Sequence, residues 1–323
     1  MTNVSAPVAS SSCCGGLSCV VYGLGVILGL IILKRVVSFI YAHFIYKNSA
    51  NYKNKWVLIT GATAGIGEGF AHEFSKRGAN IIMAVRSQSK ADLLKQALES
   101  KYKNQVEIVI IDFESASRDD IKQALTTAIG TQRQIDVLVN NVGVNNTDNC
   151  PFPFLEQPEG DFDRLIKVNI HSVVSVTRAV LPFMSANGTI LNLSSYTAKF
   201  PTPLMAVYAA TKSFINAFGL ALKYEVPKMQ VYGLSPMWVK SEMTMIKKAS
   251  LLMPEAITYA KQTVDKIGCP IGIEYGLTST YWPHDLVVSL ISLVPESLVM
   301  KQMKGFLSSL MKRLQAKKNA KKE

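Results

Sequence analysis

A short apolar run that leads directly into three closely spaced glycines is the feature that most constrains how this chain can fold. Residues 55–60 read Lys-Trp-Val-Leu-Ile-Thr, as a buried parallel strand should, and a stretch of helical composition begins at Glu68. A glycine-rich turn on its own also occurs in ordinary βα loops. The order strand, glycines, helix favours an α/β unit whose helix N-terminus binds a phosphate group.

Each glycine of this block has a separate expected task. Gly61 makes the tight turn, Gly65 lets the backbone approach a pyrophosphate, and Gly67 lets the helix pack close to its strand. Three residues separate the first two glycines, which differs from the Gly-x-Gly-x-x-Gly spacing. The residues expected to contact a dinucleotide here are Gly61, Thr63, Ala64, Gly65, Ile66 and Gly67.

The ends of the next two strands bear on which dinucleotide is bound. The strand 80–85 leads into Arg86, at a position where NAD-binding chains use a carboxylate to hold the ribose 2′-hydroxyl. A guanidinium pairs with a 2′-phosphate instead, so we predict NADP(H); a solvated surface arginine is the alternative. Asp112, after the strand 106–111, is expected either to accept a hydrogen bond from the adenine amino group or to be the N-cap of the next helix.

A second group of polar residues lies far downstream. Ser195 follows the predicted strand 189–193, Tyr208 comes thirteen residues after it, and Lys212 follows one helical turn later. Reduction of a ketone needs a proton donor, and bringing the pKa of the Tyr208 phenol from about 10 to about 7 requires about 4 kcal/mol of differential stabilisation. The ammonium of Lys212 on the same helix face, together with the cofactor's positive charge, is expected to supply it.

Two further residues complete this predicted set. The Ser195 hydroxyl is expected to polarise the substrate oxygen, and Asn169, inside a long helical pattern, to anchor a water that relays protons to Lys212. Taken singly, these residues are equally well explained as a strand cap, a helix kink and a chance helical pair. Their conjunction downstream of a phosphate-binding turn indicates a nicotinamide-dependent carbonyl reductase.

On these motifs the chain resembles the short-chain dehydrogenase/reductase family over about residues 54–245. The segment 140–143, Asn-Asn-Val-Gly, is similar to the family's Asn-Asn-Ala-Gly element. The segment 236–241 is similar to its Pro-Gly-x-Val-x-Thr, with Met237 in place of the glycine and Ser241 in place of the threonine. The resemblance implies that Ser195, Tyr208, Lys212 and Asn169 are catalytic. It also implies cofactor contacts at Asn141, Gly143, Tyr208, Lys212, Pro236, Val239 and Ser241.

Within the family, the chain resembles the microsomal branch of 17β-hydroxysteroid dehydrogenases and very-long-chain 3-oxoacyl-CoA reductases. The features in common are Val142, the missing glycine at 237, the hydrophobic N-terminal segment and Pro254-Glu255 before a helix. The resemblance implies NADPH-dependent reduction of a lipophilic ketone, foremost a long-chain 3-oxoacyl-CoA, with fatty-acid elongation enzymes as partners. A steroid dehydrogenase and a non-catalytic membrane scaffold are the alternatives.

The alternation of strands and helices continues unbroken from residue 56 to 236, which predicts one doubly wound parallel sheet of the Rossmann type rather than two domains. We divide the chain into an N-terminal tail and membrane segment (1–53), the reductase domain (54–245), a substrate-covering segment with terminal helices (246–300) and a basic tail (301–323). The sequence shows no metal-ligand spacing, and we expect no metal. The five cysteines do not suggest a disulfide framework.

The N-terminal segment is long enough to be a membrane helix. Residues 17–33 carry no charge and form a helix of about 26 Å, slightly short of a ~30 Å hydrocarbon core; Lys34-Arg35 interrupts the apolar run, which resumes at 36–46. No Lys or Arg precedes the segment, unlike a signal peptide, and the cations after it predict a reductase domain that faces the cytosol. The resemblance to the microsomal branch implies that the membrane is that of the endoplasmic reticulum. Gly25-x-x-x-Gly29 is compatible with helix packing in a homodimer.

The net charge of +12 is concentrated near the two ends of the chain. Residues 34–53 carry four cations and 301–323 carry eight against one carboxylate, whereas 54–300 are nearly neutral. This distribution argues against a nucleic-acid partner and suits an anionic membrane surface, where the apolar stretches 286–294 and 306–311 are expected to lie unless they pack on the core. The ending Ala-Lys-Lys-Glu resembles a dilysine retrieval signal, with its lysines one position too close to the terminus.

Overall fold

The protein is built around one parallel sheet. The computed structural model describes residues 13–270 and 279–319, so the dilysine-like ending lies outside the described residues. Six parallel strands form the sheet in the order β3-β2-β1-β4-β5-β6. They are β1 (Trp56–Thr60), β2 (Asn80–Val85), β3 (Val106–Ile110), β4 (Ile135–Asn140), β5 (Met184–Leu193) and β6 (Gln230–Leu234). The predicted doubly wound α/β fold is confirmed.

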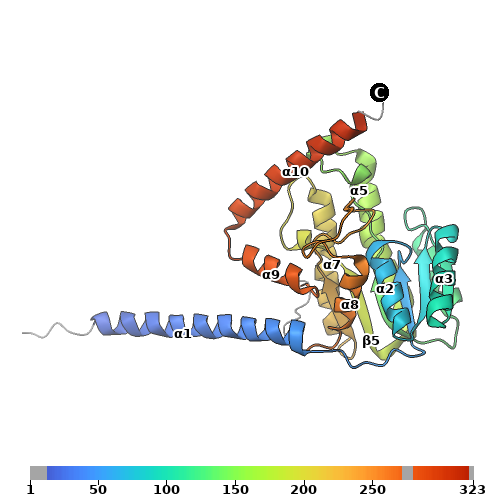
Figure 1. Cartoon of the computed structure of the whole chain (residues 1–323), viewed down its shortest axis with the longest axis horizontal. Helices are drawn as coiled ribbons and strands as arrows, with labels where there is room; N and C mark the ends of the chain where they lie inside the picture. Colours follow the sequence, from blue (N-terminus) through green and yellow to red (C-terminus); the bar gives the residue numbers. More distant parts are fainter. Residues whose placement is uncertain (1–12, 271–278, 320–323) are drawn as a thin grey trace, which may run out of the picture.

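Helices cover both faces of this sheet (Figure 1). One face packs on α2 (Gly65–Lys76), α3 (Gln88–Tyr102) and α8 (Ala256–Val264). The other face packs on α4 (Arg118–Ile129), α6 (Ser172–Val180) and α7 (Ala206–Glu225). Alternate residues of β1 serve the two cores: Val57 and Ile59 lie in the first, and Leu58 in the second. Burial on both faces explains why the strands are continuously apolar rather than alternating.

The strand order reverses between β1 and β4, and this reversal positions the site. Connections leave β1 toward β2 on one side and β4 toward β5 on the other, so the loops after the two strands diverge. In open parallel sheets a ligand binds in the crevice outside the carboxyl ends of the strands at such a point. The glycine block follows β1, and the Asn140-Asn141-Val142-Gly143 element begins at the end of β4.

The N-terminal helix is longer than the sequence suggests. Helix α1 (Cys13–Ile40) continues through Lys34-Arg35 and ends in a π-helical turn, Tyr41–Ile45, so the two cations do not break it. Within the span Ser18–Ile45, the most apolar 18-residue window has a mean hydropathy of 2.2 and is unburied, and the helix projects away from the domain (Figure 1). By length and composition it is able to cross a membrane.

The base of α1 is fixed to the domain by buried polar contacts that the sequence analysis did not anticipate. His43 lies 2.9 Å from Asp285 through its Nε2, and both side chains are almost fully buried. The Lys266 ammonium donates to the backbone oxygen of His43 at 3.0 Å, and the Tyr46 hydroxyl donates to that of Ile267 at 2.9 Å. The connection between α1 and the sheet domain is therefore a packed joint.

The C-terminal part of the chain is helical. Helix α8 begins two residues after Pro254, as expected. After it come α9 (Trp282–Ile291) and α10 (Glu296–Asn319), which meet at a bend of 120°. The shorter α5 (Glu159–Ile166) lies before α6. The stretch 306–311 was expected either to lie on a membrane surface or to pack on the core. Leu307 is buried, as core packing requires, whereas the Phe306 side chain is largely exposed.

Close packing of α2 on α8 requires a glycine, which a substitution can test. A Cβ at position 69 would lie 2.6 Å from the backbone oxygen of Ala256, so Gly69→Ala should force α8 to shift and destabilise the fold by about 1–3 kcal/mol. Gly160→Ala is the matched control, because a Cβ at that α5 position meets nothing within 4 Å. Thermal unfolding should show a drop of several degrees for the first variant only; equal melting temperatures would contradict the packing.

Candidate active site

The glycine block adopts the conformation that its residue types predict. Gly61 and Gly65 have φ of +65° and +57°, in the left-handed region that side chains disfavour. A Cβ at position 67 would lie 2.3 Å from the backbone oxygen of Gly61 and 2.4 Å from the Asn141 side-chain nitrogen. The turn therefore has no room for a side chain at this point.

Asn141 ties the end of β4 to this turn. Its side-chain nitrogen donates to the backbone oxygens of Thr60 and Gly61 at 2.9 and 3.1 Å. The backbone N–H groups of Asn141 and Val142 both donate to the Thr60 hydroxyl at 2.9 Å. The side-chain donors of Asn141 are thus used in holding the turn, and its expected cofactor contact stays a prediction.

The start of α2 fits a pyrophosphate. The N-cap of this helix is Ala64, whose side chain cannot cap it, so the first-turn N–H groups receive no side-chain acceptor from the N-cap. An anion is a natural acceptor for such donors, and the missing Cβ atoms of the glycines let it approach. Arg86 is exposed at the end of β2, and within residues 13–270 and 279–319 no carboxylate lies at ion-pair distance from it. These features fit NADP(H) at the carboxyl edge of β1 and β2.

Asp112 is not the N-cap of the next helix. Helix α4 begins at Arg118, and its N-cap is Ser117, which forms a capping box with Asp120. The Asp112 carboxylate instead accepts hydrogen bonds from the Glu114 backbone N–H at 3.1 Å and the Ser115 hydroxyl at 3.0 Å. The expectation that Asp112 is the N-cap was wrong, because five residues separate it from the start of α4. The expected contact with the adenine amino group stays a prediction.

The structure brings Ser195, Tyr208 and Lys212 together. Ser195 follows the carboxyl end of β5, while Tyr208 and Lys212 lie one turn apart on α7. The Ser195 hydroxyl hydrogen-bonds the Tyr208 phenol. The Lys212 ammonium lies 5.7 Å from the centre of the Tyr208 ring and donates to the backbone oxygen of Leu193 at 3.0 Å. A serine, a phenol and a buried ammonium thus meet at one edge of the sheet.

Burial dominates the pKa of the phenol when only the protein's own side chains surround it. Burial raises the pKa of Tyr208 to about 12, although the hydrogen bond from Ser195 opposes this. Burial also lowers the pKa of Lys212 to about 8. The expected pKa near 7 relied on the Lys212 ammonium together with the cofactor's positive charge. The side chains alone do not lower the pKa of the phenol, because desolvation outweighs the charge of a single ammonium several ångströms away, and the expectation for the cofactor-bound site stays a prediction.

Asn169 lies in a π-helical segment, Lys167–His171, between α5 and α6. Its side-chain oxygen accepts from the Val144 N–H at 2.7 Å, and its side-chain nitrogen donates to the Val144 oxygen and to the Thr211 hydroxyl at 3.0 and 3.1 Å. A Cβ at Gly143 would lie 3.3 Å from the Asn169 side-chain oxygen and 3.2 Å from the Lys212 ammonium. Asn169 therefore joins the loop after β4 to α7 beside Lys212, whereas the predicted role in anchoring a water is not tested by these contacts.

The segment 236–241 lies against the glycine block. The Ser241 Cβ is 3.2 Å from the position that a Cβ would take at Gly65. The Pro236 oxygen accepts from the Tyr196 N–H at 3.0 Å, Val239 is buried, and the Ser241 hydroxyl is 3.2 Å from that of Thr244. Of the sequence-predicted residues of this segment, Ser241 is thus close to the glycine block.

Two residues near the site were missed by the sequence analysis. Tyr196 directly follows Ser195, and burial together with the neighbouring Tyr208 raises its pKa to about 12. His284 accepts from the Met237 N–H at 3.2 Å and contacts the Leu252 oxygen at 3.1 Å, and burial lowers its pKa to about 4. The position of Tyr196 at a strand end was an available signal, whereas nothing in the sequence links position 284 to 237.

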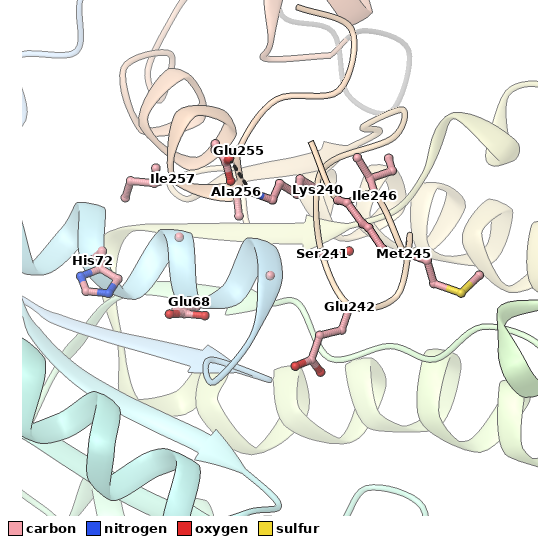
Figure 2. A pocket seen from close by; sticks show the side chains of 13 residues that line it. Glu68, His72, Lys240, Ser241, Glu242, Met245, Ile246, Glu255, Ala256 and Ile257 are labelled. Carbon is pink, nitrogen blue, oxygen red and sulfur yellow. Dashed lines mark hydrogen bonds and ion pairs between the residues drawn. The ribbon is translucent and has the colours of Figure 1, made fainter. Parts of the chain in front are cut away.

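A groove of about 610 Å³ opens on the outer side of the segment 240–247, between α2 and the start of α8 (Figure 2). It touches the glycine block at Gly65 and the segment 236–241 at Ser241, but none of Ser195, Tyr208 and Lys212 lines it. Glu68 and Glu242 face it, and burial together with Glu242 raises the pKa of Glu68. Three carboxylates (Glu68, Glu242 and Glu255) and two lysines (Lys240 and Lys247) line the groove. This excess of carboxylates and the absence of Ser195, Tyr208 and Lys212 from the lining disfavour the groove as the cofactor site.

Comparison with known proteins decides the family. The family model for short chain dehydrogenase matches residues 55–251. The chain belongs to the short-chain dehydrogenase/reductase family. It is 35% identical to a very-long-chain 3-oxoacyl-CoA reductase of Mus musculus over 265 residues, which is 80% of this chain and 81% of that protein. It is 34% identical to one of Coprinopsis cinerea over 253 residues, covering 75% and 73% of the two chains. The expected resemblance to this branch is confirmed, and the chain is an oxidoreductase.

Solved structures agree with this family. A short-chain dehydrogenase from Sphingobium yanoikuyae in complex with NADPH is 25% identical, with a TM-score of 0.57 over 65% of this chain and 83% of that one. A short chain dehydrogenase from Salmonella enterica has a TM-score of 0.64 at 19% identity, over 72% and 97% of the two chains, which shows the fold alone. A nicotinamide cofactor therefore suits the fold as well as the glycine block.

The burial of Lys212 predicts a pH-dependent stability effect. Its pKa falls from 10.5 to about 8 on folding, so between these values the unfolded chain binds more protons and stability rises with pH; below about pH 8 the full penalty of burying the cation applies. Lys212→Met should raise the melting temperature at pH 7, and this gain should shrink toward pH 10. Lys223→Met, at an exposed position of the same helix, should show no such trend. A gain independent of pH would contradict a buried cation.

Proposed function

We propose that this protein reduces the 3-oxo group of a long-chain 3-oxoacyl-CoA with NADPH, a step of fatty-acid elongation. The observation that carries the proposal is the meeting of Ser195, Tyr208 and Lys212 beside the glycine block, in a chain of this family. The names of the curated relatives support a 3-oxoacyl-CoA as the substrate.

In this proposal, each of the four polar side chains has a separate role in the transfer of a proton to the ketone. Ser195 donates a hydrogen bond to the ketone oxygen and Tyr208 donates a proton to it. Lys212 stabilises the resulting phenolate, and Asn169 holds the loop after β4 beside Lys212. Because the phenol alone has a raised pKa, Tyr208 needs a second nearby positive charge in order to act as an acid near neutral pH.

The cofactor would lie along the carboxyl edge of β1 and β2. The residues of the glycine block and the first turn of α2 would hold the pyrophosphate, and Arg86 the 2′-phosphate. The nicotinamide end would be held near Tyr208, Lys212 and the segment 236–241, with Ser241 binding its carboxamide. When bound, NADPH supplies the hydride.

We also propose that the enzyme is anchored by α1 in the endoplasmic reticulum membrane, with the reductase domain in the cytosol and elongation enzymes as partners. The length and hydropathy of α1 and the cations that follow its apolar part support this. A homodimer through Gly25 and Gly29 is compatible with the helix, because no protein atom lies within 4 Å of a Cβ at either position.

A 17β-hydroxysteroid dehydrogenase with the same side chains is the second candidate, supported by the resemblance of the motifs to that branch. A non-catalytic scaffold is disfavoured, because a scaffold has no need of a buried lysine beside a phenol and a serine. The substrate assay below separates the three.

Membranes that contain the protein should oxidise NADPH faster with a long-chain 3-oxoacyl-CoA than with a 17-ketosteroid, as measured by absorbance and product analysis. Tyr208→Phe removes the proton donor and should lower kcat on the order of 100- to 10,000-fold. Faster turnover of the steroid would favour the second candidate, and turnover with neither would favour the scaffold.

Tyr224→Phe is the matched control for this variant. Tyr224 lies on the same helix and is 76% exposed, so its hydroxyl is remote from the reaction. Equal turnover in Tyr208→Phe and Tyr224→Phe would remove the role proposed for Tyr208.

Arg86 should determine the cofactor preference. Arg86→Ala removes a charge-assisted hydrogen bond to the 2′-phosphate, so kcat/KM for NADPH should fall roughly ten- to hundredfold while that for NADH stays level or rises. Arg118→Ala, at the start of α4, is a control for loss of a surface charge. An unchanged ratio between the two cofactors would show that Arg86 is a solvated surface residue.

A further inference from the structure

The bend between α9 and α10 carries apolar side chains that the domain does not cover. We call residues 286–298 the elbow; they comprise the end of α9, the turn 292–295 and the start of α10. Leu290, Leu293 and Leu298 are 55%, 76% and 53% exposed, and Leu286 and Val294 are also exposed. Within the elbow the only charged side chain is Glu296. Exposed apolar side chains that cluster on a protein surface and are flanked by polar residues mark an interaction site.

The elbow lies on the side of the domain toward which α1 extends. In Figure 1, the junction of α9 and α10 projects beyond the sheet domain in the direction that α1 takes as it leaves. The two elements also share a joint, because Asp285 in the first turn of α9 holds His43 at the base of α1. A membrane that contains α1 would therefore face the elbow.

The backbone of the elbow is suited to an apolar medium. The N–H groups of Ser292, Leu293 and Val294 donate to Val288, Leu290 and Ile291 at 3.1, 3.1 and 3.0 Å, and Pro295 has no N–H. The Ser292 hydroxyl also donates to the Val288 oxygen, at 2.7 Å. A turn whose donors are all bonded internally avoids the penalty that otherwise excludes irregular backbone from lipid.

Charge limits how deeply the elbow can enter. Glu296 opens α10, where the positive end of the helix dipole stabilises a carboxylate, and this position keeps it near water. Lys301 and Lys304, one and two turns further along, are exposed. Their ammonium groups are placed to meet lipid phosphates while the leucines enter the boundary between headgroups and acyl chains, about 5–10 Å deep.

The two helices that flank the elbow, α9 and α10, both pack against the domain. In α9, His284 and Asp285 are buried; in α10, Leu307 is buried and the Phe306 ring lies 5.4 Å from that of Trp238. Because both helices are held on the same side, α9 and α10 enter and leave one leaflet and do not form a second span.

We propose that the elbow is a second membrane contact, inserted into the leaflet that faces the reductase domain and specific for a lipid surface rather than a protein partner. This rests on the proposed anchoring by α1. Together, the two contacts hold the domain in one orientation, with α10 between the bilayer and the ring of Trp238, which itself lies 6.0 Å from that of Tyr196 beside Tyr208.

Depth-dependent quenching tests this proposal in the full-length chain. A single cysteine in a background with serine at the five native cysteines would carry an environment-sensitive fluorophore, at Leu293→Cys, at Leu28→Cys on α1 or at Leu155→Cys. Leu155 is 94% exposed and not part of the elbow. The protein would be placed in vesicles of phosphatidylcholine with a minority of phosphatidylserine and lipids that carry a nitroxide high on the acyl chain.

The label at 293 should be quenched roughly threefold more than the label at 155. Equal quenching at 293 and 155 overturns the proposal, and the label at 28 then shows whether the anchor fails as well. In sealed vesicles, an impermeant maleimide should reach Ser309→Cys from the same side as Leu155→Cys. Opposite sides would overturn the single-leaflet geometry in favour of a second span.

Discussion

The close approach of the β1–α2 turn to the end of β4 is the constraint on which the rest of the site depends. The oxygen of Gly61 lies where any side chain at position 67 would be, and the Asn141 amide binds both Thr60 and Gly61. This contact joins the two strands at which the sheet order reverses, and it aims the free N–H groups of α2 at the carboxyl edge. From that edge, the end of β5 and the face of α7 lie within reach of one bound molecule.

Burial has opposite consequences for the two ionisable groups of the site. It makes Lys212 easier to deprotonate and Tyr208 harder to ionise, so the packing that fixes their positions also opposes the charge separation that proton transfer needs. The hydrogen bond from Ser195 offsets only part of this. An acid of this kind stays protonated at neutral pH until positive charge is brought close to it, which ties the acidity of Tyr208 to the occupancy of the site rather than to the fold alone.

The sequence was sufficient for the elements whose signal is local. Apolar runs located the strands, the glycines located the tight turn between β1 and α2, and helical spacing placed Tyr208 and Lys212 one turn apart on α7. It failed where the outcome depends on contacts distant in the chain. The N-cap alternative for Asp112 was wrong because Ser117 and its capping box begin α4 instead, and the raised pKa of the Tyr208 phenol in the protein alone was not foreseen because desolvation depends on neighbours from several elements. Asn169 likewise lies in a π-helical turn and bonds Val144 and Thr211, contacts between distant parts of the chain that a local pattern does not reveal.

The first turn of α9 shows how two adjacent side chains can orient an enzyme on a membrane. His284 accepts a hydrogen bond from the N–H of Met237, which lies in the segment 236–241. Burial lowers the pKa of His284, so its imidazole is neutral and able to accept this hydrogen bond. Its neighbour Asp285 binds His43 at the base of α1. A flexible linker between anchor and domain would let the site sample many orientations. A buried joint restricts these orientations. In the proposed membrane anchoring, a substrate whose acyl chain partitions into the bilayer and whose headgroup stays in water would therefore meet the site from one direction only.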